Sequence, residues 1–409
     1  MNKTKRPPDY WLLVIVFTLL ILGLIMVFSS SSVTAAGSAE CNFDPYFFLK
    51  RQASWALIAV LVMMWAMRLD LEKLRKWSLP FVLLSVIALA AVMEHHIGIV
   101  VNGARRWIAL GPFGFQPSEM AKFALVFYLA DCLARRGSKI QRFARLVPLL
   151  IIFAATVLLI NMEPDLGTAL VVSASFMGVL FMSGARFAHL AGLVSLGVLA
   201  VIVQIFKDQY KRDRLATFLH PFQDSGDKGY QIVQSLIGLG SGGLFGLGLG
   251  ESRQKFNYLP ESHTDFIFSI LGEELGLVGT LAVLFLFLLL LYRGLRIAVK
   301  ARDNYYALLA AGLSFTIVFQ AFLNIGVVSA SLPLTGIPLP FISYGGTSLV
   351  ITMGAIGLLA NISSRRRERR EESQEIAPPT TETENLMRRF HEMGYGLVPA
   401  TRLRSKSGR

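Results

Sequence analysis

The chain has 409 residues, of which 54% are hydrophobic and only 16% are charged, and its mean hydropathy is +0.54. A soluble domain of ordinary composition has about 25% charged residues, so these values exclude a soluble enzyme and indicate a polytopic membrane protein. The formal net charge of +13 does not indicate a nucleic-acid partner, because the basic residues lie between apolar runs and suit anionic lipid.

Ten apolar segments follow one another, each long enough with its flanks for one membrane helix. They are residues 10–28, 47–67, 77–93, 117–134, 146–160, 166–182, 190–206, 266–292, 305–324 and 342–359. The polar residues 1–9 precede the first segment, which we expect to be an uncleaved signal anchor. The predicted fold class is therefore all-α, with ten transmembrane helices in one membrane domain of residues 10–362.

Lysine and arginine gather in the loops after the second, fourth, sixth and eighth segments and in the cluster 365–367. By the positive-inside rule, these loops and both termini are cytoplasmic. The longest outward loop, residues 207–265, then lies between the seventh and eighth spans. Residues 363–409 are charged and have no sustained apolar period, so we predict a basic, disordered cytoplasmic tail.

A cluster of ionisable side chains stands at the entrance to the eighth span, where His263 and Asp265 precede a long apolar run. Ionisable groups at membrane depth are costly and therefore point to function. If the helix begins near Asp265, Glu273 shares its face. Such a carboxylate can accept a proton from an attacking hydroxyl or hold a divalent metal. A helix-capping role for Asp265 stays open, and His263 either orients the loop or transfers protons.

A second outward cluster joins Arg106 and Trp107 to Glu119 and Lys122. Pro117 suits the first turn of a helix, on which Glu119 and Lys122, three residues apart, share a face. One interpretation is a local ion pair that lets both groups tolerate the interface. The other is a site for a phosphate-bearing lipid head group, which needs the cationic and aromatic groups found at this level.

Three further outward stretches are informative. The turn after the fifth span holds Glu163 and Asp165, which either pair with basic side chains of the neighbouring loop or act directly. The glycine-rich run 240–250 either approaches a phosphate or is a plain connector, and residues 230–238 suggest a helix lying on the membrane. The uncharged loop 332–348 suggests an ordered re-entrant segment lining a cavity.

Several of these motifs, in this order, resemble the SEDS family of shape, elongation, division and sporulation proteins. The residues that carry the resemblance are Leu259-Pro260-Glu261-Ser262-His263-Thr264-Asp265-Phe266-Ile267-Phe268, Gly272-Glu273-Glu274-Leu275-Gly276, Asn102-Gly103-Ala104 with Arg106-Trp107-Ile108, Gln116-Pro117-Ser118-Glu119, Pro164-Asp165-Leu166-Gly167-Thr168 and Ser343-Tyr344-Gly345-Gly346. Within the family, residues 44–52 and 229–236 resemble the FtsW and sporulation branch more than the RodA branch.

The resemblance implies a peptidoglycan glycosyltransferase that polymerises lipid II at the outer face of the bacterial cytoplasmic membrane, for the division septum or the spore cortex. It implies a class B penicillin-binding protein as partner, together with other divisome proteins. By motif, Asp265 would activate the sugar 4-hydroxyl that displaces undecaprenyl pyrophosphate from the lipid-linked chain, with inversion.

The resemblance and the charge pattern together give a set of cavity or substrate-binding residues. They are Glu119, Lys122, Arg106, Trp107, Asp165, Glu163, His263, Glu273, Arg212 and Arg214. Arg106, Lys122, Arg212 and Arg214 are the candidate cations for the pyrophosphate. A divalent cation, Mg²⁺ or Mn²⁺, is a possible cofactor with Asp265 as its ligand, and no organic cofactor is expected.

Three alternatives stay open: a RodA-like elongation polymerase, a lipid II flippase and a noncatalytic scaffold. A flippase should place substrate-binding charge near the midplane, accessible from both faces. Here the charge lies at the outward rim instead, which favours an enzyme. A scaffold that only recruits a transpeptidase would leave Asp265 dispensable.

Overall fold

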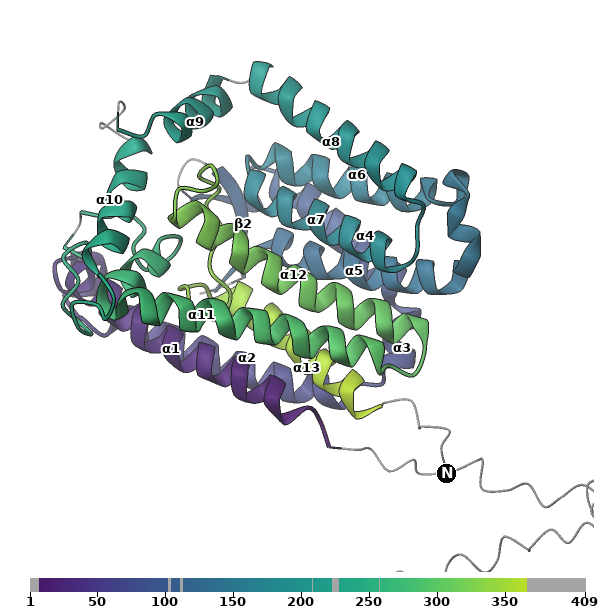
Figure 1. The fold of residues 1–409 in the computed structure, drawn as a ribbon, viewed down its shortest axis with the longest axis horizontal. Coiled ribbons are helices and arrows are strands. Elements are labelled where there is room, and N and C mark those ends of the chain that lie inside the picture. The colour runs from purple at the N-terminus through teal and green to yellow at the C-terminus, as the bar shows by residue number, and fades with distance from the viewer. Residues whose placement is uncertain are drawn as a thin grey trace, which may run out of the picture. The chain divides into compact units, whose positions relative to one another are not determined.

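A computed structural model describes residues 7–101, 104–110, 113–207, 209–222, 228–256 and 258–365 (Figure 1). The chain divides into a unit of residues 1–366 and a second of residues 367–409, and the described ranges fall within the first. The tail predicted from residue 363 lies outside the described residues from position 366 onward.

Each of the ten predicted spans coincides with a helix. These helices are α1 (Tyr10–Ala36), α2 (Phe47–Arg68), α4 (Ser78–Val92), α5 (Pro117–Arg136), α6 (Val147–Met162), α7 (Leu166–Met182), α8 (Phe187–Lys207), α11 (Ile267–Val299), α12 (Asn304–Val328) and α13 (Gly346–Ser364). Within the described residues, six are long and apolar enough to cross a membrane, and α4, α6 and α7 are apolar but shorter. The helical polytopic fold is confirmed, and the number of crossings stays a prediction.

Shorter elements connect these helices. They are η1 (Ala39–Cys41), α3 (Leu71–Lys76), η2 (Gly137–Gln141), η3 (Phe143–Arg145), α9 (Gln209–Leu219) and α10 (Lys228–Ser241). The helix α10 contains the amphipathic stretch that the sequence predicts. In Figure 1, α8, α9 and α10 follow one another along the upper and left edge of the drawing.

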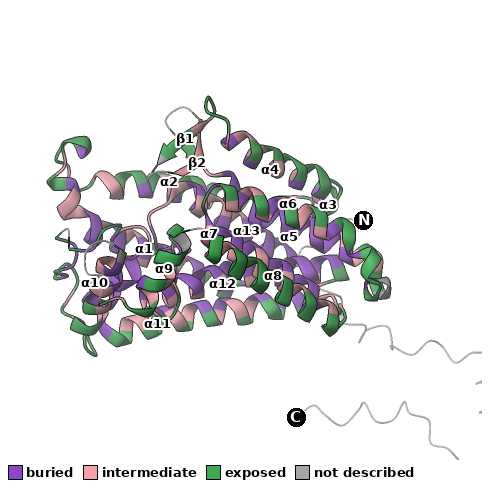
Figure 2. Cartoon of the chain, turned by 90° about the horizontal axis from the view of Figure 1, so that it is seen from above, coloured by how far each residue is buried: buried purple, intermediate pink, exposed green. Residues whose placement is uncertain are grey.

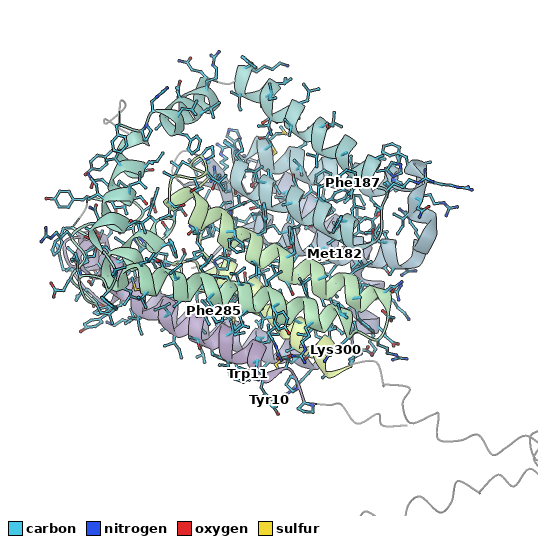
Figure 3. The ribbon with its side chains drawn as sticks, viewed as in Figure 1. Tyr10, Trp11, Met182, Phe187, Phe285 and Lys300 are labelled. Atoms are coloured by element: carbon cyan, nitrogen blue, oxygen red, sulfur yellow. The ribbon has the colours of Figure 1, made fainter. Side chains whose placement is uncertain are left out.

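Burial separates an inner group of helices from an outer one. Most of α12 and α13 is buried, whereas α8 is almost entirely exposed (Figure 2). In a membrane protein, the exposed apolar side chains of α8, such as Phe187, face lipid (Figure 3). Inner helices approach closely through small residues, since a Cβ on Gly357 of α13 would collide with the backbone of Met63 on α2.

A small sheet interrupts the helices and corrects the expectation of an all-α fold. Its strands β1 (Gly98–Val101), β2 (Ala104–Leu110) and β3 (Phe113–Phe115) are antiparallel in the order β1-β2-β3. Branched and aromatic residues favour these strands, and cross-strand pairs such as Ile99 with Trp107 stabilise them. The sheet presents Arg106 and Trp107 on β2, directly before α5.

The helix α11 is broken at Gly276, whose φ of 66° and ψ of −164° are not helical. The break leaves backbone groups without helical partners, and the glycine-rich run 240–250 supplies them. Four hydrogen bonds do this: Leu247 N to Glu273 O (2.9 Å), Gly248 N to Glu274 O (3.1 Å), Leu277 N to Gly243 O (2.9 Å) and Val278 N to Leu244 O (3.1 Å).

This pairing explains why the run contains so many glycines. A Cβ on Gly242 or Gly246 would collide with the carbonyls of Gly272 and Glu274, and one on Gly276 would collide with the amide of Gly246. The run is therefore more than a plain connector, and the other interpretation that the sequence leaves open, its approach to a phosphate, stays a prediction. It is a closely packed partner of the broken helix and pairs with backbone groups that the break leaves open.

Candidate functional site

The carboxylate of Asp265 lies in the turn that leads into α11, and its side chain is half-buried. The helix begins at Ile267 with Phe266 as its N-cap, which confirms the predicted start near Asp265 but leaves Asp265 itself outside the helix. The Asp265 carbonyl accepts a hydrogen bond from Nδ2 of Asn324 (2.7 Å). Its Oδ2 lies 3.4 Å from the place of a Cβ on Gly336, where φ is +69°.

The uncharged loop 332–345 holds the turn that carries Asp265. The Ser343 hydroxyl donates to the Thr264 carbonyl (2.6 Å), and the Tyr344 amide donates to the His263 carbonyl (2.9 Å). The same Asn324 amide that binds Asp265 also donates to the Ile337 carbonyl (2.7 Å). The loop and the turn therefore form one ordered unit of irregular backbone, which the surrounding helices bury.

His263 packs between aromatic rings, with its ring centroid 4.6 Å from that of Phe48 and 5.7 Å from that of Tyr344. Burial lowers the pKa of His263 below its usual value, although the nearby Glu261 opposes this shift. The imidazole is therefore neutral at physiological pH. This packing favours the orienting role among the two that the sequence allows.

A buried ion pair lies beside this unit. Nζ of Lys122 lies 2.8 Å from Oε1 of Glu119, and the two residues are only 1% and 2% exposed. Lys122 also donates to Oε1 of Gln320 (2.5 Å), whose amide nitrogen donates to the Pro338 carbonyl (3.0 Å). The pair is thus connected to the loop that touches Asp265.

Gln320 and Asn324 are site residues that the sequence interpretation missed. They lie four residues apart on α12, so both project from one face of the helix. Gln320 joins the ion pair to the loop 332–345, and Asn324 joins the same loop to Asp265. The sequence could have indicated them, because burying two amide side chains at helical spacing inside an apolar span costs free energy unless both are hydrogen-bonded.

The acidic turn between α6 and α7 is held from two sides. The Asp165 carboxylate caps α7 by accepting from the Thr168 amide (2.9 Å) and hydroxyl (2.8 Å). Arg106 on β2 donates to the carbonyls of Glu163 (2.8 Å) and Pro164 (2.5 Å). The turn also packs against the loop 332–345, since Gly167 lies against Ile337.

The Glu163 side chain is 2% exposed, and neither carboxylate oxygen has a hydrogen-bond partner among the described residues. Burial, and secondarily the charge of Asp165, raises its pKa to about 8, while Arg106 opposes the shift. Glu163 is therefore largely protonated at neutral pH. The turn therefore combines a buried, protonated carboxylic acid, Glu163, with the carboxylate of Asp165, which caps α7.

Glu273 does not share a face with Asp265, contrary to the prediction. Asp265 precedes the helix, and the Glu273 carboxylate accepts hydrogen bonds from residues 252–254 instead. The donors are the Ser252 hydroxyl, the Arg253 amide (3.1 Å) and the Gln254 amide (3.3 Å). Glu273 therefore fixes the large loop to α11.

The remaining predicted residues lie further from this unit. Trp107 packs against Gly114 of β3, with Cε3 3.2 Å from the place of a Cβ there. Arg212 is exposed on α9 and donates to the Phe206 carbonyl (3.5 Å). The side chain of Arg214 and the dipeptide Asn102-Gly103 lie outside the described residues.

Sequence comparison places this arrangement among known proteins. A family model for cell cycle proteins of the FtsW, RodA and SpoVE type matches residues 10–368. The chain belongs to this family. It is 43% identical over 368 residues to stage V sporulation protein E of Bacillus subtilis, covering 90% of this chain and all of that protein. It is 40% identical over 366 residues to a probable peptidoglycan glycosyltransferase FtsW of a Geobacter species, covering 89% and 99%.

Solved structures of family relatives have the same fold. A chain of a peptidoglycan synthase complex that coordinates polymerization and crosslinking superposes with a TM-score of 0.72 and 31% identity, over 88% of this chain and 99% of that one. The rod shape determining protein RodA of Thermus thermophilus gives a TM-score of 0.66 and 29% identity, over 88% and 98%. This family member is therefore a multi-pass membrane protein, and its relatives' names confirm the predicted FtsW and sporulation branch.

Proposed function

We propose that the protein is a peptidoglycan glycosyltransferase that polymerises lipid II for the division septum or the spore cortex. The placement of Asp265 carries this proposal: a half-buried carboxylate next to Gly336, on backbone fixed by Asn324. A carboxylate on a fixed backbone can serve as a general base at a defined position. The names of the relatives support the same activity.

In the proposed reaction, Asp265 accepts the proton of the sugar 4-hydroxyl as that oxygen attacks the anomeric carbon of the lipid-linked chain. The new C–O bond forms as the bond to undecaprenyl pyrophosphate breaks from the opposite face, so the anomeric centre inverts. The proton passes from Asp265 to solvent after the pyrophosphate leaves. Asn324 holds the backbone of Asp265 during attack, and the missing side chain of Gly336 leaves space beside the carboxylate.

The charge of the leaving pyrophosphate needs compensation. Lys122 is the buried cation connected to the loop beside Asp265, whereas the Arg106 guanidinium is engaged by two backbone carbonyls. The described residues contain no group of three or more His, Cys, Asp or Glu side chains that could hold a metal. Mg²⁺ is often bound by one carboxylate together with substrate phosphates, so in an alternative to its role as the base Asp265 would be the ligand of such an ion, which would neutralise the pyrophosphate.

We place the site at the outer face of the bacterial cytoplasmic membrane, with both termini cytoplasmic, because of the distribution of arginine and lysine. We also infer a class B penicillin-binding protein as partner, and other divisome proteins beyond it. The complex in which one structural relative works supports this partner, since its two activities are polymerization and crosslinking.

The decisive experiment compares wild type with Asp265→Asn for polymerisation of purified lipid II, alone and with a class B transpeptidase. We expect at least about 100-fold less glycan from the variant, the usual contribution of a general base. Asp44→Asn is the matched control, because among the described residues the Asp44 carboxylate accepts only from neighbours in its own segment, namely the exposed Lys50 and the Tyr46 amide.

The outcomes separate the alternatives. Equal product from wild type and Asp265→Asn would remove Asp265 from the mechanism. No product from either protein, even with the partner, would favour a flippase or a scaffold. A RodA-like elongation role would instead require activity with an elongation transpeptidase and none with a division or sporulation one.

A further inference from the structure

An exposed apolar segment lies where the glycine-rich run meets the broken helix. We call residues 244–249 the apolar loop. Four of its six residues are large and apolar, and all four are exposed; Phe245 is 81% exposed. They are Leu244, Phe245, Leu247 and Leu249. A contiguous exposed patch of this kind marks a surface that contacts something other than water.

The backbone of the apolar loop cannot move away from α11, because it is part of the hydrogen bonding at the break. The Leu244 carbonyl accepts from the amide of Val278, and the amides of Leu247 and Gly248 donate to α11 carbonyls. The depth of residues 273–278 in the membrane is therefore also the depth of the apolar loop.

That depth follows from the other end of α11. Arg293 is held there by Asp9, with both carboxylate oxygens 2.5 Å from Nη2, and Arg296 and Lys300 follow. These charges mark one boundary of the hydrocarbon. At about 1.5 Å per residue, Leu277 lies ~24 Å above Arg293, inside a hydrocarbon core about 30 Å thick. Any tilt of the helix brings Leu277 deeper still.

The exposed apolar surface of the loop is also continuous with that of α11. The α11 residues Val278, Leu281 and Phe285, which follow the break, are apolar and exposed, as contact with lipid requires; Phe285 is 62% exposed (Figure 3). The apolar loop hydrogen-bonds directly to Val278 and so continues this surface. Its backbone is compatible with lipid, since the polar groups around the break bond to one another.

A cavity of about 430 Å³ lies beside the loop, between α10, α11 and α12. Glycines and apolar side chains line it, among them Gly243, Leu281 and Ile325, together with Thr280, whose hydroxyl bonds to the Leu277 carbonyl. Such a cavity does not favour water, but an acyl chain suits it.

We propose that the apolar loop is a wedge inserted into the hydrocarbon of the membrane leaflet on the Asp265 side, where lipid chains contact Phe245 and fill the adjacent cavity. Only the assignment of that leaflet as the outer one rests on the proposed function. The insertion itself follows from hydrogen bonding, length and exposure.

The test is spin labelling of the full chain in phospholipid nanodiscs. The two native cysteines, Cys41 and Cys132, are first replaced by serine, and a single cysteine is then placed at Phe245. Phe285→Cys is the lipid-facing reference, and Glu251→Cys, on an exposed residue just after the loop, is the aqueous reference. We measure nitroxide collisions with oxygen, which concentrates in hydrocarbon, and with a water-soluble nickel chelate.

We expect the oxygen-to-nickel ratio at position 245 to match position 285 and to exceed position 251 several-fold. A ratio matching position 251 would overturn the wedge and leave the apolar loop as a surface for a protein partner. The readout does not depend on catalysis. Polymerisation with a water-like position 245 would refute only the wedge, and a lipid-like position 245 without polymerisation would refute only the proposed function.

A second measurement needs no substitution. Wild-type protein is irradiated in vesicles that contain a phospholipid with a photoactivatable acyl chain, and is then digested after lysine and arginine. The wedge predicts labelling within the peptide 229–253, at residues 244–249. Label on peptides of α11 but none on this loop would contradict the proposal.

Discussion

The two ends of the helical body differ in how completely their buried carboxylates are bonded, although Asp165 and Glu273 at the Asp265 end do accept hydrogen bonds. At the end where α1 begins, both oxygens of Asp9 bond to Arg293, and Asp131 accepts from Arg75 (2.6 Å) and Arg135 (2.8 Å). At the Asp265 end, one oxygen of Glu119 and both oxygens of Glu163 have no partner among the described residues.

We relate this difference to a stabilising role of the carboxylates at one end and a chemical role of those at the other. An unpaired buried polar atom costs folding free energy, so it is expected where a ligand or a proton will later use it. Oδ1 of Asn324 and Oγ1 of Thr335 are likewise buried without a described partner, and both residues adjoin or belong to the segment that touches Asp265. Nε of Arg293 and the Tyr305 hydroxyl are buried without a described partner at the Asp9 end, so the contrast holds only for carboxylates. The bonded carboxylates Asp9 and Asp131 contribute stability, and we infer that Glu119 and Glu163 give up stability for function.

Lys122→Met should have the largest effect, because it removes the cation at the Asp265 end and leaves Glu119 charged and buried. We expect a stability loss of about 3–5 kcal/mol and at least about 100-fold less lipid II polymerisation. Thermal unfolding and glycan gels measure the two effects.

The double variant Glu119→Gln/Lys122→Met separates the two effects. Removing both charges should restore most of the stability, since no uncompensated charge is left buried. It should not restore polymerisation. Full activity in a stable double variant would show that the pair is purely structural, and the contrast between the two ends would fail.

Asp9→Ala should affect stability alone. Arg293 would be left buried without its carboxylate, which costs about 3–5 kcal/mol. Activity per folded molecule should stay at the wild-type level, as measured at a temperature where both proteins are folded. Lys50→Ala is the control, because its ion pair with Asp44 is exposed and is worth at most about 1 kcal/mol. A specific loss of polymerisation in Asp9→Ala would contradict the division of roles.

Glu163→Gln should have the smallest effect, and only in one pH range. The pKa of Glu163 is raised in the folded state from 4.5 to about 8, so the folded chain retains a proton that the unfolded chain loses. Wild-type stability must therefore fall as pH rises through this range, by up to about 2.7 kcal/mol over two pH units. The neutral glutamine should remove this slope, so that the variant is the more stable protein at high pH.

Melting temperatures of both proteins across this pH range provide the measurement. Parallel curves for wild type and Glu163→Gln would show that Glu163 ionises normally in the folded state. Asp165→Asn is not a substitute control, because the Asp165 carboxylate caps α7.

The sequence predicted the helices well because apolar runs of membrane length have few alternatives. It failed where backbone pairing decides the structure. The paired Val101 and Ala104 are separated by Asn-Gly, a strong hairpin signal between branched residues, yet the dipeptide was interpreted only as a family motif.

Side-chain partners were harder to predict than elements. The position of Asp265 before a span was evident, but the start of α11 two residues later separates it from Glu273. Hydrogen bonds from residues 252–254 to Glu273 depend on how a long loop folds back, which no local pattern encodes. The amides of Gln320 and Asn324 showed the right spacing, but their partners lie in a loop that follows them in sequence.

The break at Gly276 has a mechanical consequence. The helical hydrogen bonds of α11 are interrupted at Gly276. A rotation of the long segment, which ends near Arg293, is therefore not transmitted through helical hydrogen bonds to the short segment next to Asp265. By contrast, α12 is continuous from Asn304 to Val328 and carries both Gln320 and Asn324. A movement that starts at the Arg293 end can therefore be transmitted to Asn324 and Asp265 through the continuous helix α12, whereas the interruption in α11 allows its two segments to move separately.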